Sequence, residues 1–251
     1  MAKRTIRLLT ESYTDRPAFD TAVSRSILRK VSDGDEPETL RLYRPGRIVA
    51  FGPQDTRAPG YKDAIAIARK GGFQAVNRLA GGRAAVFHED TIAFSWAIPD
   101  TDPKRRVQER FEEIADIMAR AFRQLGVDAY VGEIEGEYCP GKYSVNARGK
   151  TKLMGVAQRI AVKAAHVGGV VVVDGSSRVR DILIPVYEAL ELDWNPATTG
   201  SVRDEVASVT YQDVHQAILD QFAKSYALTN GSMPLELVEL AETMAAEHLA
   251  S

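Results

Sequence analysis

The sequence contains one cysteine, Cys139, and it stands directly before a Pro-Gly pair in the segment Glu137-Tyr-Cys-Pro-Gly-Lys-Tyr-Ser144. Pro-Gly is a strong turn signal, and a thiol at a turn can be reached by a substrate. Thiolates form covalent intermediates with acyl groups, so Cys139 is a candidate nucleophile. A single free cysteine is also commonly a small buried hydrophobic residue, and the residue type alone leaves both interpretations open.

The residues before Cys139 oppose its activation. Three glutamates precede it at alternating positions: Glu133, Glu135 and Glu137. On a strand they would share a face with the thiol, and neighbouring carboxylates disfavour a thiolate. A reactive Cys139 therefore needs a positive charge from another part of the fold, such as Lys152 or Arg83.

A second segment places paired glycines, Gly81 and Gly82, between two strand-like runs and between Arg78 and Arg83. Such glycines allow backbone N–H groups to approach a ligand closely, and the arginines could bind a phosphate or carboxyl-like oxygen. The same pattern is typical of a plain hairpin turn. It is neither a dinucleotide-binding fingerprint nor a Walker loop, because the required spacing and the Gly-Lys-Ser/Thr ending are missing.

A third segment begins an apolar run with Lys152, and Gly149 and Gly155 bracket it. A lysine at this place could bind a carbonyl oxygen or a phosphoryl group. The alternative is a solvated lysine on an edge strand, which is common because it protects the edge from aggregation.

The three segments, in this order and spacing, resemble the lipoate/biotin protein ligase and octanoyltransferase superfamily. The stretch from Arg78 to His88 resembles its Arg-x-Ser/Thr-Gly-Gly-x-Ala-Val signature, and Lys152 to Ala157 resembles its Lys-x-x-Gly-x-Ala signature. The stretch from Glu137 to Tyr143 resembles the Tyr-Cys-Pro-Gly-x-Tyr segment of the cysteine-dependent octanoyl-[glycine-cleavage H protein]:protein N-octanoyltransferases. The resemblance covers roughly residues 41–200.

This resemblance implies an acyltransferase that moves an octanoyl or lipoyl group to a lysine of lipoyl-domain proteins through a Cys139 thioester, with Lys152 as second catalytic residue. The implied acyl- and substrate-binding residues are Arg78, Ala80, Gly81, Gly82, Arg83, Ala84, His88, Gly155 and Ala157. The implied partners are the glycine-cleavage H protein, E2 subunits of 2-oxoacid dehydrogenases and, as another donor, acyl carrier protein. No cofactor or metal is required.

Two alternatives stay open. One is an ATP-dependent lipoate ligase that acts through lipoyl-AMP and uses Mg²⁺; the other is a non-catalytic protein that binds lipoate or a lipoyl domain. Ala80 stands where the family has Ser or Thr, and His88 where an aspartate is usual. Arg83 replaces the third glycine of the ligases, as in the cysteine-dependent transferases. The lipoyl-synthesis octanoyltransferases do not match, since no cysteine follows Lys152.

Hydrophobic periodicity predicts the elements that must position these segments. Helices are expected over residues 17–31, 62–70, 103–125, 178–190, 212–226 and 234–249. We expect Asp15 to cap the first of these and Pro185 to break the fourth. Strands are expected over residues 40–43, 48–51, 75–78, 84–87, 91–98, 129–131, 143–147, 153–160 and 167–173. The last of these is a continuous valine run, which predicts a central strand buried on both faces.

Strands and helices do not alternate strictly along the chain, so the predicted class is α+β, with a mixed, largely antiparallel sheet flanked by helices. The resemblance implies a class II aminoacyl-tRNA-synthetase or biotin-ligase-like fold. The 251 residues predict one catalytic domain, in which the helices from about residue 178 could form a small C-terminal subdomain.

The composition narrows the function further. The net charge of −2 gives no whole-molecule field for nucleic acid or anionic membrane, although a local basic group could steer an acidic lipoyl domain. That group comprises Lys142, Arg148, Lys150, Arg159 and Lys163. One cysteine excludes an internal disulfide, and four distant histidines lack metal-ligand spacing. The N-terminal apolar run is too short for a signal peptide or a membrane span, so the sequence predicts a cytoplasmic protein.

Overall fold

One large sheet forms the centre of the computed structural model, which describes residues 3–251. In these residues the strands follow the order β11-β1-β2-β6-β10-β9-β8-β7. Their bounds are β1 (Arg4–Leu9), β2 (Thr39–Tyr43), β6 (Thr91–Pro99), β7 (Ala129–Val131), β8 (Val145–Ala147), β9 (Thr151–Ile160), β10 (Ala164–Val172) and β11 (Tyr226–Asn230). Strand β1 pairs in parallel with β11 and β2, and the other pairs are antiparallel. The prediction of a mixed, largely antiparallel sheet is therefore confirmed.

A second, smaller sheet has the order β4-β3-β5. Its strands are β3 (Ile48–Phe51), β4 (Gln74–Asn77) and β5 (Ala85–Phe87). Helices α2 (Tyr61–Lys70) and α4 (Ser176–Ala189) pack against each other beside it, and they share one apolar cluster with its strands. The sequence predicts these strands but not their separation from the main sheet, because a short apolar run does not indicate which strand it pairs with.

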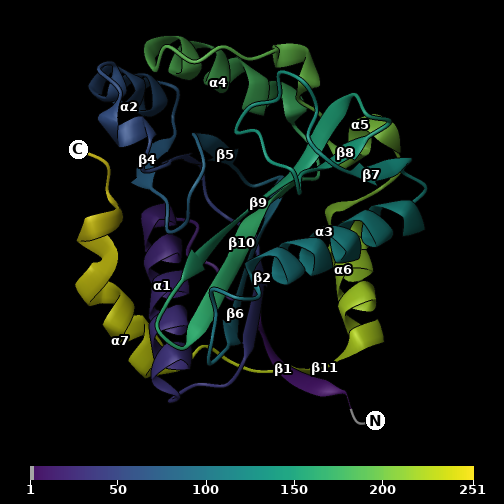
Figure 1. The fold of residues 1–251 in the computed structure, drawn as a ribbon. Coiled ribbons are helices and arrows are strands. Elements are labelled where there is room, and N and C mark those ends of the chain that lie inside the picture. Colours follow the sequence, from purple (N-terminus) through teal and green to yellow (C-terminus); the bar gives the residue numbers. More distant parts are fainter. Residues whose placement is uncertain (1–2) are drawn as a thin grey trace.

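Helices cover both faces of the large sheet (Figure 1). Their bounds are α1 (Pro17–Asp33), α3 (Val107–Gln124), α6 (Tyr211–Ser225) and α7 (Leu235–Met244). Trp96 points into the apolar core shared with α3 and α6, whereas the next residue, Ala97, packs with α1 and α7. This alternation along β6 places α3 and α6 on one face of the sheet and α1 and α7 on the other. A short helix, α5 (Val202–Glu205), follows the loop after α4.

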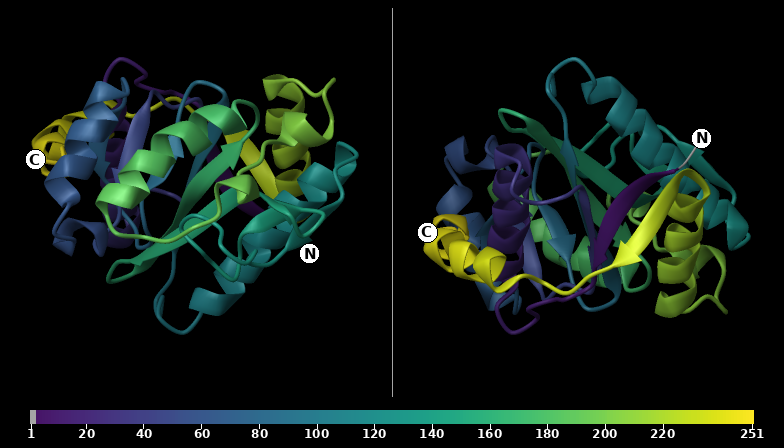
Figure 2. Two further views of the ribbon diagram at one scale, coloured as in Figure 1. Left: turned by 90° about the horizontal axis from the view of Figure 1, so that it is seen from above. Right: turned by 90° about the horizontal axis from the view of Figure 1, so that it is seen from below.

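The longer helices of the C-terminal part pack against three different elements: α4 against α2, α6 against α3 and α7 against α1. Figure 2 shows α7 beside α1, and β11 beside β1, although these pairs come from opposite ends of the chain. The C-terminal part of the chain therefore adds a strand to the sheet beside β1 and a helix to the layer that contains α1. Among the described residues, no helix is long and apolar enough to cross a membrane.

Several local predictions are wrong. Arg16 rather than Asp15 precedes α1, and its side chain makes no capping hydrogen bond. Helix α4 continues through Pro185, because apolar residues on both sides of the proline are buried and their packing outweighs the lost backbone hydrogen bond. The predicted helix over residues 103–125 begins at Val107, and the last one ends at Met244 and continues as a 3₁₀ turn.

Strands β1 and β11 are not predicted from the sequence. Polar residues interrupt the apolar run of β1, and most residues of β11 are exposed, so neither strand has a clear hydrophobic pattern. The prediction that the N-terminal stretch is not a signal peptide concerns in part Met1 and Ala2, which lie outside the described residues. The rest of that stretch contains β1.

Candidate active site

The loop between β7 and β8 holds Cys139 in a left-handed backbone conformation, with φ of 43°. This conformation is uncommon for residues other than glycine, and it persists only where surrounding contacts hold it. Because the segment is a loop rather than a strand, the three glutamates before Cys139 share no face with it. Glu133 and Glu135 are exposed, whereas Glu137 is buried. The three carboxylates therefore do not surround the thiol, as they would if this segment were a strand.

Two donors converge on the Cys139 sulfur. The backbone N–H of Arg83 lies 3.2 Å from Sγ, and the Arg78 guanidinium lies 3.6 Å from it. The Arg83 guanidinium instead pairs with the buried carboxylate of Asp55 at 3.4 Å. The cation beside the sulfur is thus Arg78, which the sequence assigned only to substrate binding, rather than the side chain of Lys152 or Arg83.

Gly82 provides the space that the thiol occupies. Its φ is 107°, and a Cβ atom at this position would lie 2.9 Å from Cys139 Sγ and 2.9 Å from Arg78 Nη1. Its neighbour Gly81 has no atom within 4 Å of the corresponding position. Of the two predicted glycines, only Gly82 is required by both backbone conformation and contact.

Lys152 lies on the internal strand β9 and is 1% exposed, so the interpretation as a solvated edge lysine is wrong. Its ammonium donates to Glu137 Oε1 at 2.9 Å, to the Tyr138 carbonyl at 3.0 Å and to the Cys139 carbonyl at 2.7 Å. An ammonium has three N–H groups, so these three acceptors use all of them. Lys152 therefore holds the main chain of the cysteine loop.

The Glu137 carboxylate that pairs with Lys152 is itself fixed within the same loop. Its Oε1 accepts from the Ser144 hydroxyl at 2.6 Å and from the Gly141 N–H at 3.1 Å. Both ionised groups are almost fully buried, and each is stabilised by the other together with neutral donors or acceptors. The pair gives the loop one defined shape around the sulfur.

A cavity of about 330 Å³ opens beside the sulfur, within the size range of small-molecule sites. Seven of its lining residues are predicted site residues: Arg78, Gly81, Gly82, Cys139, Lys152, Gly155 and Ala157. Its apolar walls are not among the predicted site residues, and they include Phe87, Phe111, Tyr138, Val156 and Val170. The rings of Phe111 and Tyr143 stack with centroids 5.0 Å apart. The arrangement combines a thiol and a guanidinium with an apolar slot.

Four predicted residues do not line this cavity. Arg83 contributes its backbone N–H, and Ala84 is buried. Ala80 lines two neighbouring hollows. His88 is fully buried and contacts Arg178, because it follows Phe87 on an extended segment and so faces away from the cavity. Burial, followed by the charge of Arg178, lowers the pKa of His88 to about 4.

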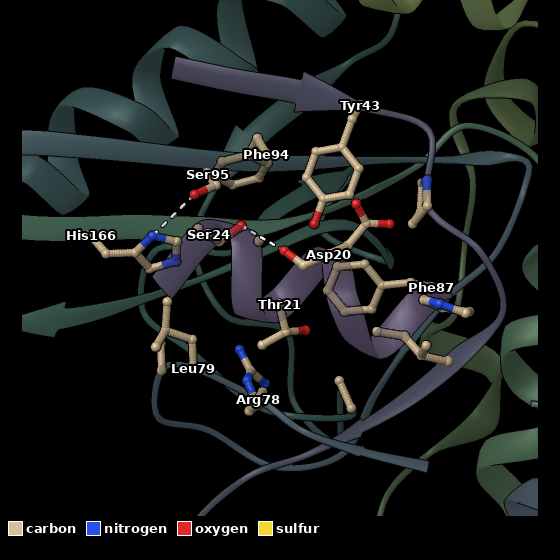
Figure 3. A pocket seen from close by; sticks show the side chains of 17 residues that line it. Asp20, Thr21, Ser24, Tyr43, Arg78, Leu79, Phe87, Phe94, Ser95 and His166 are labelled. Atoms are coloured by element: carbon tan, nitrogen blue, oxygen red, sulfur yellow. Dashed lines mark hydrogen bonds between the residues drawn. The ribbon is translucent and has the colours of Figure 1, made fainter. Parts of the chain in front are cut away.

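One of those hollows is a chamber of about 70 Å³, and Figure 3 shows the side chains that line it. Arg78, Phe87 and Gly169 line both spaces, so they form the partition between them. In the chamber, His166 Nδ1 lies 3.2 Å from the Ser95 hydroxyl. Burial, and then the charges of Arg78 and Arg159, lower the pKa of His166 to about 4, so this imidazole is neutral at physiological pH.

Residues 16–223 match the model of the lipoyl protein ligase A/B catalytic domain. The chain belongs to this family. The match begins one residue before α1 and ends within α6, so it leaves out strands β1 and β11 of the large sheet. It includes every predicted site residue and confirms the family to which the three sequence segments pointed.

Curated relatives place the chain among acyltransferases of the lipoyl ligase A/B family. It is 27% identical over 218 residues to lipoyl-[GcvH]:protein N-lipoyltransferase of Listeria monocytogenes, covering 81% of this chain and 78% of the relative. It is 30% identical over 182 residues to octanoyl-[GcvH]:protein N-octanoyltransferase of Geobacillus kaustophilus, covering 71% and 64%. These relatives confirm the predicted enzyme class, an octanoyl or lipoyl transferase.

Solved structures confirm the lipoate ligase fold. Lipoate-protein ligase A bound with ATP superposes with a TM-score of 0.80 at 20% identity, covering 98% of this chain and 95% of that one. Protein Ta0514 of T. acidophilum, a putative lipoate protein ligase with bound lipoic acid, gives 0.77 at 20% identity, covering 98% and 96%. At this identity the likeness concerns the fold alone.

Three further residues of this family member support the site without a sequence signal. Asp55 is buried and binds the Arg83 guanidinium. Gly52 lies so close to the glycine loop that a Cβ atom there would be 1.6 Å from the Gly82 carbonyl oxygen. Tyr187 contacts the backbone of Cys139. Within residues 3–251, no group of three histidine, cysteine or acidic side chains is placed to hold a metal ion.

Gly82→Ala should lower acyl transfer about tenfold, because the new methyl group displaces the sulfur or Arg78, and small displacements of reacting groups cost rate steeply. Gly72→Ala is the matched control, since Gly72 has a similar φ of 80° but no atom within 4 Å. It should lose stability through backbone strain while transferring at the normal rate. Equal losses of transfer in the two variants would show that strain alone matters.

Proposed function

We propose that the protein transfers an octanoyl or lipoyl group between lipoyl-domain proteins through a thioester on Cys139. In the first step the thiolate attacks the acyl carbonyl carbon, the carbonyl–nitrogen bond of the donor breaks, and the leaving lysine amine takes up a proton. In the second step the amine of the acceptor lysine attacks the thioester. The carbon–sulfur bond breaks, the thiolate returns, and the new amide nitrogen loses a proton, so protons balance over the cycle.

The observation that carries this proposal is the position of the Cys139 sulfur, between the Arg83 N–H and the Arg78 guanidinium at the wall of the cavity. An N–H donor and a guanidinium stabilise negative charge on sulfur, both before attack and when the thiolate leaves again. The lone thiol also favours the cytoplasm as the working compartment, because it remains reduced there.

Charge on the carbonyl oxygen in the tetrahedral intermediate needs donors other than Lys152. Lys152 is predicted from the sequence to bind the carbonyl oxygen, but all three of its N–H groups bind acceptors within the cysteine loop. Arg78 lines the cavity beside the sulfur and has donors to spare, since within residues 3–251 only its Nη1 binds an acceptor. We therefore assign the oxyanion to Arg78, and to Lys152 the task of holding the loop.

The acyl chain would lie along the apolar wall formed by Phe87, Phe111, Val156 and Val170. Burial of an octanoyl chain contributes about 5 kcal/mol, at about 0.8 kcal/mol for each methylene. The chain is then a large part of donor recognition, and it excludes water from the thioester.

The names of the curated relatives support the glycine-cleavage H protein as donor. We propose E2 subunits of 2-oxoacid dehydrogenases as acceptors, with acyl carrier protein as another donor.

The prediction that five basic residues form a single docking group for the lipoyl domain is wrong. Arg148 and Lys150 precede β9, whereas Arg159 and Lys163 lie at its far end. At about 3.3 Å per residue the two pairs are roughly 30 Å apart. Of the five basic residues in the predicted docking group, only Lys142 lines the cavity.

We propose that the reaction needs neither ATP nor a metal ion, and this separates the transferase from a lipoate ligase. The test is intact mass spectrometry of the protein after incubation with octanoylated H protein, without ATP. A single octanoyl adduct that disappears when unmodified E2 lipoyl domain is added would support the proposal. Transfer from free lipoate that depends strictly on ATP and Mg²⁺, with no adduct on the protein, would instead identify a ligase. Tight binding of the lipoyl domain without either reaction would identify a binding protein.

A further inference from the structure

The side chain of Tyr187 connects three parts of the site through hydrogen bonds. It projects from α4, is 2% exposed, and its hydroxyl accepts a hydrogen bond from the Cys139 N–H at 2.8 Å. The same hydroxyl donates to the Ala84 carbonyl at 3.0 Å. One phenol oxygen thereby joins helix α4, the cysteine loop and the segment that leads from the glycine loop into β5.

The Cys139 backbone needs such support. Its φ of 43° costs free energy for a residue with a side chain, and the residue keeps this conformation only if neighbouring groups fix it. Tyr187 binds the N–H of Cys139, and Lys152 binds its carbonyl oxygen at 2.7 Å. The two polar groups of the residue's own main chain are thus fixed by two side chains from different elements.

The second hydrogen bond of Tyr187 sets where the sulfur points. Ala84 directly follows Arg83, whose N–H donates to Sγ. By binding both Ala84 and Cys139, the phenol fixes the distance between the donor and its acceptor. We propose that Tyr187 is a positioning residue, which holds the Cys139 sulfur against the Arg83 N–H without touching the substrate. This inference rests on the proposed function, because only a nucleophilic Cys139 makes the position matter for turnover.

The chemistry of the phenol fits this task. Burial, and then the nearby Cys139, raise the pKa of Tyr187 well above its ordinary value, so the hydroxyl keeps its proton and can accept and donate at once. The arrangement also commits the Cys139 N–H to Tyr187. That N–H is therefore unavailable to the oxyanion, which agrees with the assignment of the oxyanion to Arg78.

The test compares Tyr187→Phe with Tyr61→Phe. Both changes remove one hydroxyl from the same apolar cluster, but the Tyr61 hydroxyl donates to Asn77 at 2.6 Å and contacts no part of the cysteine loop. Two rates are measured for each variant: alkylation of Cys139 by iodoacetamide, and octanoyl transfer, separated into kcat and KM. Alkylation reports on one thiol, since the chain has a single cysteine. It requires no acyl chemistry, so it remains informative if the proposed function fails.

We expect Tyr187→Phe to slow alkylation and to lower kcat about tenfold with little change in KM, since a displacement of about 1 Å can cost up to about 10²-fold. Tyr61→Phe should change neither rate. Normal rates in Tyr187→Phe, or equal losses in both variants, would overturn the proposal. If Tyr187→Phe does not fold, hydrogen exchange of the wild-type protein decides. A protected Cys139 amide supports the proposal, and a freely exchanging one refutes it.

Discussion

The Cys139→Ser variant should lose acyl transfer by about 10⁴-fold or more, as expected when a catalytic nucleophile is removed. A serine hydroxyl needs a base to become nucleophilic, whereas the group beside this position is the Arg78 guanidinium, which cannot accept a proton. The similar size of the two side chains should leave the fold intact. The measurements are steady-state transfer from octanoylated H protein and intact mass, which should show no adduct on the variant.

The thermal unfolding midpoint of Cys139→Ser is the control, and it should stay close to that of the wild-type protein. Transfer at a normal rate by a folded serine variant would contradict the covalent mechanism. The assignment to the family and the proposed acyl group would be unaffected, but the acyl group would have to pass directly from donor to acceptor without a thioester.

Lys152→Ala should lower transfer by at least about 10²-fold, because it releases the carbonyls of Tyr138 and Cys139 and displaces the sulfur. It also leaves Glu137 buried without a counter-charge, which should reduce the free energy of unfolding by about 3–5 kcal/mol. Transfer rates and urea denaturation measure the two effects.

A double variant separates the loss of activity from the loss of stability. Lys152→Met with Glu137→Gln removes both charges, so it should recover much of the stability that Lys152→Ala loses. Transfer should remain low, because no ammonium holds the Cys139 carbonyl. Recovery of transfer together with stability would mean that Lys152 serves the fold alone.

Much of this architecture follows from periodicity in the sequence. The alternation in β6, the spacing of apolar residues in α3 and the valine run of β10 each predict the correct element, and β10 lies in the interior of the sheet. The three motif segments also meet at one cavity. These features are local or repeat along the chain, which is why a single sequence reveals them.

The contacts of the sulfur follow no such pattern. The choice of Arg78 over Lys152 depends on the positive φ of Cys139 and on the direction of each side chain, and neither is encoded by residue spacing. Tyr187 lies 48 residues beyond Cys139 on a helix without a motif. His88 stands where the family has an aspartate, but it directly follows β5 and faces away from the cavity that Phe87 lines. The sequence locates the segments of the site, and only the fold decides which atoms meet.

The pairing of the chain's two ends has a consequence for synthesis on the ribosome. Strand β1 is made more than 200 residues before its outer partner β11, and α1 is made about 200 residues before α7, which covers it. Until then the nascent chain exposes one edge of the sheet and the apolar side of α1. Such surfaces are the usual binding sites of chaperones during translation. The sheet is thus completed late, whereas the cysteine loop and its cavity need only residues that are made before β11.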